Sequence, residues 1–352
     1  MQALVPADIL RLEAFFAASK RPCIVVHTHP DGDALGSGVA LLSYLRLCRG
    51  AEACLLLPDA APASLDFLLP EEGVVDASAD PQEARARIAG CDLLCCLDMN
   101  GFGRAEGLAE SLGACTAPKV LVDHHLNPER ASFDLAFSET EISSASELLY
   151  QVLLALPGVG AAERLPLAVL TPLMAGMTTD TNNFANSVWP STLRMASELL
   201  AAGVDRDALL DQLYHNYREN RFRAMGAYLH ERLTVTPDGV AYAVLDRDFL
   251  RRYDVQDGET EGFVNLPLGI GGVRLSLFLK EDEGHFRVSI RSKAGVSANR
   301  LAAEAFHGGG HPCAAGGKLF FPQDIPAPEA AGEYIATVTA RFMRGQAPSL
   351  SE

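Results

Sequence analysis

The sequence lacks any uninterrupted apolar run of the ~20 residues that a membrane-spanning helix needs. Its first twenty residues also make a poor signal peptide, because Asp8, Arg11, Glu13 and Lys20 interrupt the apolar positions. The eight cysteines include no CxxC pair, which argues against a zinc ribbon or a thioredoxin-like site. We therefore expect a protein of the reducing cytoplasm that makes no membrane contact.

A basic excess is also missing. The chain has 29 Lys and Arg against 45 Asp and Glu, a net charge of −16, and a single tryptophan, Trp189. Binding of long nucleic acid needs an extended basic face, and tracking of a single strand needs aromatic residues interleaved with basic ones. The composition therefore argues against long duplex nucleic acid as a partner. A small phosphorylated substrate stays compatible with it if bound metals and a few basic residues reverse the local potential.

What is present is enough apolar sequence for two domains, with 48% hydrophobic residues in a chain of 352. The first half alternates short apolar runs with helical patterns, which predicts a parallel α/β sheet with flanking helices. Strands are expected at 23–26, 53–57, 91–97 and 119–122, and helices at 33–47, 144–156 and 165–177. Ser144 and Glu147 match a capping box at the start of the second of these helices.

The second half has a different pattern. Strand-like stretches occur at 234–245, 273–280 and 285–291, followed by a helical stretch at 301–306 and a glycine-rich segment. This pattern predicts a smaller α+β domain. We predict a first domain at 1–200, a polar connection or hinge at 201–222, and a second domain at 223–345.

The first candidate motif follows the first predicted strand. His27, Asp31 and Asp33 stand within seven residues, and Pro30 and Gly32 impose a tight turn on which their side chains can converge. A polar turn with a helix cap is the alternative explanation. In open α/β sheets, however, ligands bind at the carboxyl ends of the strands, which favours a functional site here.

Three more motifs follow later apolar stretches. Asp98 comes one residue after a predicted strand and alone would be read as a cap or turn residue. Asp123, His124 and His125 end another predicted strand, where a surface turn is the alternative, and Asp180 could be a helix cap. Carboxylates combined with imidazoles suit Mn²⁺ or Mg²⁺ better than a metal bound by thiolates. Together the four motifs predict a pair of metals that share a bridging aspartate and activate water for phosphoryl transfer.

A fifth element lies in the second half, where Gly308, Gly309 and Gly310 precede His311. Consecutive glycines leave backbone N–H groups accessible to an anion, although a flexible connector is the alternative. Further candidates for phosphate or base contacts are Arg291, Ser292, Lys293, Asn299 and Arg300. A solvated basic edge is the alternative explanation for Lys293 and Arg300.

In this order and spacing, the first four motifs resemble those of the DHH phosphoesterase family. The segment from Gly308 to Gly316, with Ala314 and Ala315, resembles the signature of the DHHA1 domain that follows in one of its subfamilies. The resemblance covers nearly the whole chain and is most similar to the nanoRNase/pAp phosphatase group. It implies an active site in the cleft between the two domains and a homodimer.

The resemblance also implies roles for matching residues, with two Mn²⁺ per chain and Mg²⁺ as the alternative. His27 and Asp31 would hold the first metal and Asp98 would bridge the two. The second metal would be held by Asp33, His124 and Asp180.

His125 would assist the leaving oxygen and Asp123 would orient the histidine pair, whereas His29 is outside the ligand set. The glycine loop, His311 and Arg291 would bind the distal phosphate or nucleoside.

These roles predict an enzyme that attacks phosphorus with metal-activated hydroxide. It would cleave RNA of about two to five nucleotides or remove the 3′-phosphate of adenosine 3′,5′-bisphosphate (pAp). A phosphodiesterase for linear or cyclic dinucleotides and an inactive nucleotide-binding regulator are the alternatives. The sequence departs from the family at His307, where a glycine is common, and at Asn182 and Asn183, where many relatives have a glycine. We expect the first departure to affect substrate fit and the second to affect the turn beside Asp180.

Overall fold

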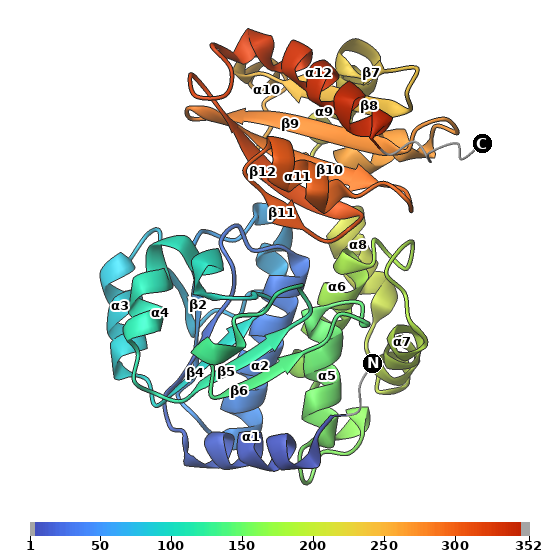
Figure 1. The fold of residues 1–352 in the computed structure, drawn as a ribbon. Helices are drawn as coiled ribbons and strands as arrows, with labels where there is room; N and C mark the ends of the chain where they lie inside the picture. The colour runs from blue at the N-terminus through green and yellow to red at the C-terminus, as the bar shows by residue number, and fades with distance from the viewer. Residues whose placement is uncertain (1–3, 346–352) are drawn as a thin grey trace, which may run out of the picture. The chain divides into compact units, whose positions relative to one another are not determined.

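The computed structural model describes residues 4–345 and divides the chain into two compact units between Asn216 and Tyr217. Each unit contains one six-stranded sheet with helices packed against it (Figure 1). Among the described residues, no helix is both long enough and apolar enough to cross a membrane.

The first unit is built on a parallel sheet in the order β3-β2-β1-β4-β5-β6. Its strands are β1 (Pro22–Val25), β2 (Cys54–Leu57), β3 (Val74–Asp76), β4 (Leu93–Leu97), β5 (Lys119–Asp123) and β6 (Leu135–Ser138). The four central strands lie at the predicted apolar runs. The two edge strands were missed because β3 is only half-buried and β6 alternates between buried and half-buried residues, so neither is an apolar run.

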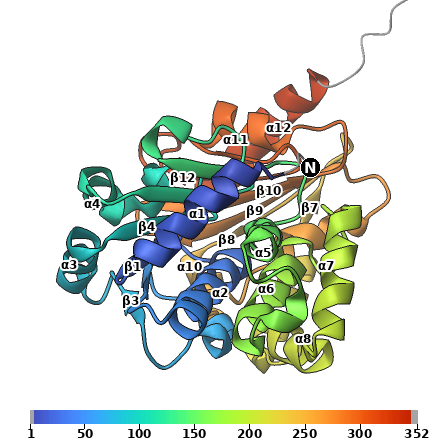
Figure 2. The same ribbon diagram turned by 90° about the horizontal axis from the view of Figure 1, so that it is seen from below.

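Helices cover both faces of this sheet, as the figures show from two directions (Figures 1 and 2). One face carries α3 (Pro81–Gly90) and α4 (Ala109–Ala114). The helices of the other face are α1 (Pro6–Ala18), α2 (Gly32–Arg49), α5 (Ala145–Ala155), α6 (Leu167–Asp180), α7 (Pro190–Ala201) and α8 (Arg206–Tyr214). Alternate residues of each central strand enter opposite cores, which explains the unbroken apolar runs and confirms the predicted parallel α/β fold.

The strand order reverses between β1 and β4. From β1 the chain builds β2 and β3 on one side, and it then returns to place β4 on the other side of β1. A reversal of this kind opens a crevice at the carboxyl ends of the two strands, where ligands bind in open α/β sheets. His27 and Asp98 follow these two strands.

The second unit has a mixed sheet in the order β11-β12-β10-β9-β8-β7. The strands are β7 (Thr234–Val235), β8 (Val240–Leu245), β9 (Leu275–Asp282), β10 (His285–Ser292), β11 (Gly309–Gly310) and β12 (Ala314–Phe320). The helices are α9 (Glu219–Ala227), α10 (Arg247–Arg252), α11 (Ala298–Ala305) and α12 (Ala331–Arg344). This is the predicted smaller α+β unit.

The glycine-rich segment is more regular than a loop. Gly309 and Gly310 form β11 and pair with Gly316 and Ala315 of β12. A Cβ at Gly308 would collide with the backbone carbonyl of Gly316, so the strands approach too closely for any residue with a side chain.

The predicted connection at 201–222 contains the division between the units. It is largely structured, because α8 buries Leu209 and Leu213 in the core of the first unit. In the second unit, the Arg218 side chain binds Glu259 at 2.7 Å and Asp254 at 3.0 Å. The stretch between these two anchored segments is therefore short.

A candidate metal centre at the carboxyl edge of the first sheet

The candidate site begins in the turn between β1 and α2. Asp31 is the N-cap of α2, and its carboxylate accepts N–H bonds from Asp33 at 3.0 Å and from Ala34 at 3.1 Å. This cap fixes the turn that places both aspartates near the end of β1. His29 takes a left-handed conformation (φ 55°), and its Nδ1 lies 3.1 Å from the Asp59 carboxylate, outside the groups described below.

His27, Asp31 and Asp98 form a first group of converging side chains. Nε2 of His27 lies 3.4 Å from Oδ2 of Asp98 and 3.8 Å from Oδ1 of Asp31. Nδ1 of His27 lies 2.9 Å from the Thr28 carbonyl and donates to it. This bond leaves Nε2 as the nitrogen that faces the carboxylates.

Asp33, His124 and Asp180 form a second group. Nε2 of His124 lies 3.8 Å from Oδ2 of Asp33, 3.7 Å from Oδ2 of Asp180 and 3.4 Å from Oδ1 of Asp98. These residues come from the start of α2, the end of β5 and the end of α6. The structure thus brings together side chains that are up to 147 positions apart in the chain (180 − 33).

Asp98 lies between the two groups. Its Oδ2 faces His27 and its Oδ1 faces His124. The side chain is buried, and Oδ1 accepts no hydrogen bond from the described residues. A buried carboxylate oxygen without a hydrogen bond is costly, so this atom marks a position at which a bound cation would be favourable. The backbone N–H of Asp98 donates to Val122 of β5 at 3.0 Å and fixes the residue beside the third motif.

His125 and Asp123 form a separate pair at the end of β5. Nδ1 of His125 lies 2.8 Å from Oδ1 of Asp123 and 3.6 Å from Oδ1 of Asp98. Asp123 is fully buried, whereas the His125 side chain keeps 19% of its surface exposed. A buried carboxylate bound to Nδ1 orients the imidazole and fixes its tautomer, with Nε2 as the other ring nitrogen.

The electrostatics of the cluster favour added positive charge. Burial acts to lower the pKa of His27, but Asp31 and Asp98 outweigh it and raise the pKa to about 10. Burial and the charges of neighbouring carboxylates raise the pKa of Asp33 and bring the pKa of Asp180 to about 6. These raised pKa values mean that His27, Asp33 and Asp180 hold protons more readily when no other cation is bound. Oxygen donors with some imidazole nitrogen are the ligands that Mn²⁺ and Mg²⁺ accept, so these residues fit divalent cations.

Some features that position the site were not evident in the sequence. The Asp33 carboxylate accepts N–H bonds from Ala145 at 2.6 Å and from Ser146 at 2.9 Å, the first two residues of α5. On its other side lies Gly176 of α6, where a Cβ would stand 2.8 Å from Oδ1 of Asp33. The capping box at Ser144 was a local signal for the start of α5, but nothing in it indicated contact with Asp33.

Asn182 and Asn183 take left-handed conformations with φ of 47° and 56°. Glycine adopts this conformation without cost and asparagine tolerates it better than most residues. Oδ1 of Asn183 also accepts a 2.5 Å hydrogen bond from Arg206 of α8. The two asparagines therefore form the turn after Asp180 that glycine would otherwise form.

His307 is also left-handed (φ 48°), and its Nε2 lies 2.9 Å from the Asp324 carboxylate. Its side chain contacts the segment after β12, and the ring packs edge-on to Phe320. This departure from the family pattern therefore anchors the start of the glycine hairpin to the end of β12.

The remaining candidates all lie in the second unit. Arg291 is the next-to-last residue of β10. His311 lies in the tight turn that joins β11 to β12, and its N–H donates to the Ala314 carbonyl at 2.7 Å. Asn299, in the first turn of α11, accepts a 2.5 Å hydrogen bond from the Ser297 hydroxyl.

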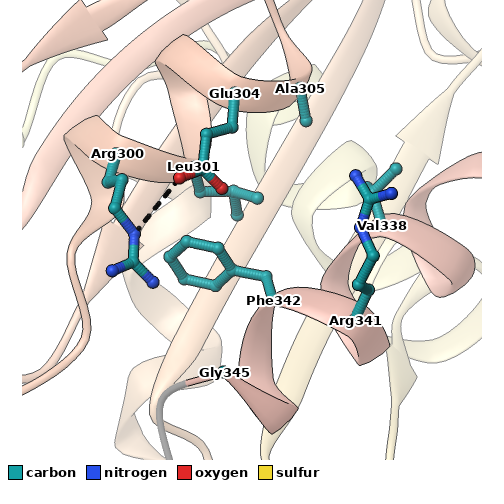
Figure 3. Close-up of a pocket in the computed structure, with 8 residues that line it drawn as sticks. All are labelled: Arg300, Leu301, Glu304, Ala305, Val338, Arg341, Phe342 and Gly345. Atoms are coloured by element: carbon teal, nitrogen blue, oxygen red, sulfur yellow. Dashed lines mark ion pairs between the residues drawn. The ribbon is translucent and has the colours of Figure 1, made fainter.

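Arg300 lines a pocket of about 130 Å³ between α11 and α12. There its guanidinium stands 4.7 Å from the centre of the Phe342 ring and its Nε stands 3.5 Å from Glu304 (Figure 3). These contacts favour the solvated edge that we considered for Arg300 over a phosphate contact.

The fold and this cluster define a two-unit α/β protein with a carboxylate- and histidine-rich site at a topological switch point. Residues 21–177 match the model of the DHH family, N-terminal domain, and residues 238–338 match the DHHA1 domain. The chain belongs to the DHH phosphoesterase family with a DHHA1 domain, which confirms the resemblance found in the sequence.

Relatives cover most of the chain. The bifunctional oligoribonuclease and PAP phosphatase NrnA of Thermus thermophilus is 32% identical over 299 residues, 84% of this chain and 83% of the relative. The protein of the same name from Bacillus subtilis is 27% identical over 314 residues, 88% of this chain and 94% of the relative. The crystal structure of an exopolyphosphatase-related protein from Bacteroides fragilis superposes with a TM-score of 0.90, at 30% identity, over 98% of this chain and 99% of that chain.

Proposed function

We propose that this phosphoesterase hydrolyses short oligoribonucleotides of about two to five nucleotides, pAp, or both, with two Mn²⁺ or Mg²⁺ ions held in the first unit. The observation that carries the proposal is the position of Asp98, whose two carboxylate oxygens face His27 and His124 of separate groups. A carboxylate placed in this way is suited to bridge two cations. The names of the Thermus thermophilus and Bacillus subtilis relatives support the substrate class.

Charge balance supports a pair of cations. When they bind cations, Asp31, Asp33, Asp98 and Asp180 would all be ionised and carry four negative charges, and two divalent cations carry four positive charges. In this proposal His27 and Asp31 hold one cation, and Asp33, His124 and Asp180 hold the other. The cations would supply Lewis acidity, which lowers the pKa of water and offsets the charge that develops on the phosphate.

The chain's own residues supply the remaining chemistry. Asp123 accepts the Nδ1–H of His125, so Nε2 of His125 is the atom that can hold or donate a proton to the leaving oxygen. A protonated His125 would also stabilise negative charge on that oxygen. Asp33, bound to two amides of α5, keeps its place without help from a substrate.

The second unit would determine substrate length in this proposal. The backbone of Gly308 to Gly310, together with His311 and Arg291, would bind the distal phosphate or nucleoside, and Asn299 would contribute a polar contact. Recognition of a terminal phosphate or nucleoside, in place of an extended strand, would favour short substrates. The net charge of −16 adds no general attraction for longer ones.

A turnover assay in Mn²⁺ tests the proposal. The panel contains pAp, pApA, pGpG, cyclic dinucleotides and RNA from two to twenty nucleotides, and compares the wild type with Asp98→Asn. Asparagine suits the left-handed backbone of Asp98 (φ 55°), so this variant should fold. It would lose the carboxylate charge that the two cations would share.

We expect wild-type cleavage of pAp or the shortest RNAs and its loss in Asp98→Asn. Preference for dinucleotides alone would move the assignment to a dinucleotide phosphodiesterase. Stoichiometric nucleotide binding without turnover of any substrate would overturn the enzyme assignment in favour of a regulator.

A further inference from the structure

Glu147 is a fully buried carboxylate that lies outside both groups of the candidate metal centre. Its Oε2 accepts hydrogen bonds from the Ser143 N–H at 3.1 Å, the Ser143 hydroxyl at 2.5 Å and the Thr192 hydroxyl at 2.7 Å. Its Oε1 accepts a bond from Gln151 at 3.2 Å. A buried carboxylate is retained at low cost only when it is bonded as fully as this one.

On one side, these bonds fix the start of α5. Ser144 caps the helix and accepts the Glu147 N–H at 3.0 Å, but the Glu147 side chain reaches one residue further back than a capping box requires, to Ser143. Glu147 therefore fixes both residues that precede α5: its side chain binds Ser143 and its backbone N–H binds the Ser144 side chain. The next two N–H groups, of Ala145 and Ser146, are the ones that bind Asp33.

On the other side, the carboxylate binds the start of α7. Thr192 donates its hydroxyl to Glu147 and accepts the Trp189 N–H at 3.1 Å. Residues 181–189 run from Asp180 to this point and include four residues with positive φ, so their path depends on where α7 begins. Glu147 therefore connects the two segments that carry or hold Asp33 and Asp180.

We propose that Glu147 is a positioning residue for the divalent cation bound by Asp33, His124 and Asp180. This inference rests on the metal-dependent function proposed above. Glu147 acts through the α5 amides that hold Asp33 and through the α7 start that sets the chain after Asp180. Among the described residues, the Glu147 carboxylate bonds to Ser143, Gln151 and Thr192 and not to His27 or Asp31. Removal of this carboxylate should therefore weaken the binding of one cation and leave the binding of the other unchanged.

A titration with Mn²⁺, followed by the electron paramagnetic resonance signal of free Mn²⁺, tests this on the full chain. The wild type should bind two Mn²⁺. Glu147→Ala should weaken one of them by about 10- to 100-fold, as loss of a group behind a metal ligand does. Glu147→Gln, which keeps one acceptor oxygen for Ser143 and Thr192, should recover most of that affinity.

A matched control exists on the same pair of helices. The Tyr150 hydroxyl of α5 donates to Glu198 of α7 at 2.6 Å, further along both helices from Asp33. Tyr150→Phe removes this second α5–α7 bond and should leave both Mn²⁺ affinities unchanged. Equal weakening by Tyr150→Phe and Glu147→Ala would overturn the proposal in favour of general loosening.

Should Glu147→Ala fail to fold, Thr192→Val removes the bond to Glu147 together with the acceptor of the Trp189 N–H, and it keeps the Ser143 bonds. This variant should weaken the binding of the same single Mn²⁺. Two unchanged sites in whichever variant folds would overturn the proposal. Turnover is scored separately: a wild type that binds two Mn²⁺ but cleaves no substrate refutes the proposed activity and leaves the titration decisive for Glu147. A wild type that binds no Mn²⁺ refutes both.

Discussion

Nδ1 of His125 lies 2.8 Å from Oδ1 of Asp123, two residues before it at the end of β5. Asp123 is fully buried, and a buried carboxylate needs a hydrogen-bond partner such as this imidazole. The pair fixes which ring nitrogen of His125 carries the proton. The pair therefore determines whether Nε2 of His125 can donate a proton to the leaving oxygen.

Asp123→Asn tests this pair. An asparagine amide can turn its N–H₂ toward Nδ1 and reverse the tautomer, so we expect kcat to fall by about 100-fold with little change in KM. Steady-state kinetics in saturating Mn²⁺ measure the effect. The matched control is Asp134→Asn, because Asp134 binds the Lys119 N–H at the opposite end of β5. Equal loss in both variants would contradict a role for the Asp123–His125 pair.

Gly176→Ala tests the close packing of α6 against Asp33. Alanine favours a helix over glycine by about 1 kcal/mol, yet here its Cβ would meet Oδ1 of Asp33 and the Ser146 hydroxyl. We expect loss of Mn²⁺ affinity of about tenfold or more and a destabilisation of about 1–3 kcal/mol from overpacking.

Mn²⁺ titration and urea unfolding of Gly176→Ala measure both effects. Gly90→Ala, at the exposed end of α3 with open space around the new Cβ, is the control and should be neutral or stabilising. Unchanged Mn²⁺ affinity in Gly176→Ala would show that Asp33 tolerates a shift of α6.

Asn182 offers a test of the turn that follows Asp180. Its φ of 47° suits glycine, so Asn182→Gly should keep turnover and stability. Asn182→Val should destabilise the protein by about 1–2 kcal/mol, because a β-branched residue disfavours the left-handed region. Thermal unfolding and Mn²⁺ titration of the two variants measure these effects. Equal stability of the two variants would mean that the turn takes another backbone conformation without loss of stability.

Asp92 gives the expected dependence of stability on pH away from the metal centre. Partial burial acts to raise its pKa, but hydrogen bonds from the Ser19 hydroxyl and the N–H groups of Lys20 and Arg21 lower it overall. A lowered pKa in the folded state means that the carboxylate stabilises the fold above its unfolded pKa. That stability is lost as the pH falls below about 4, through the folded pKa.

Asp92→Asn should therefore destabilise the protein at pH 7 by up to about 1 kcal/mol, since solvent screens this exposed group. The difference from the wild type should shrink as the pH is lowered to 3. Melting temperatures of both proteins across this range measure it, and a difference that stays constant with pH would exclude the carboxylate charge as the cause.

The sequence indicated where the candidate residues lie, because most of them follow apolar strands. Strands buried on both faces appear as apolar runs, and their last residues are fixed to within one or two positions, as for β4 before Asp98. Edge strands β3 and β6 carry no such signal, so they were missed. Asp98 alone resembled an ordinary turn residue. Its position between His27 and His124 depends on β4 lying beside both β1 and β5.

The type of fold, the family and the segments that carry acidic and histidine side chains can be predicted from the chain alone, since these depend on local periodicity and on motif order. Three relationships required the three-dimensional packing: the two oxygens of Asp98 face different histidines, the α5 amides hold Asp33, and Glu147 connects α5 to α7. These are contacts between segments far apart in the chain. They are set by how helices pack on the sheet, and packing geometry leaves no period in a single sequence.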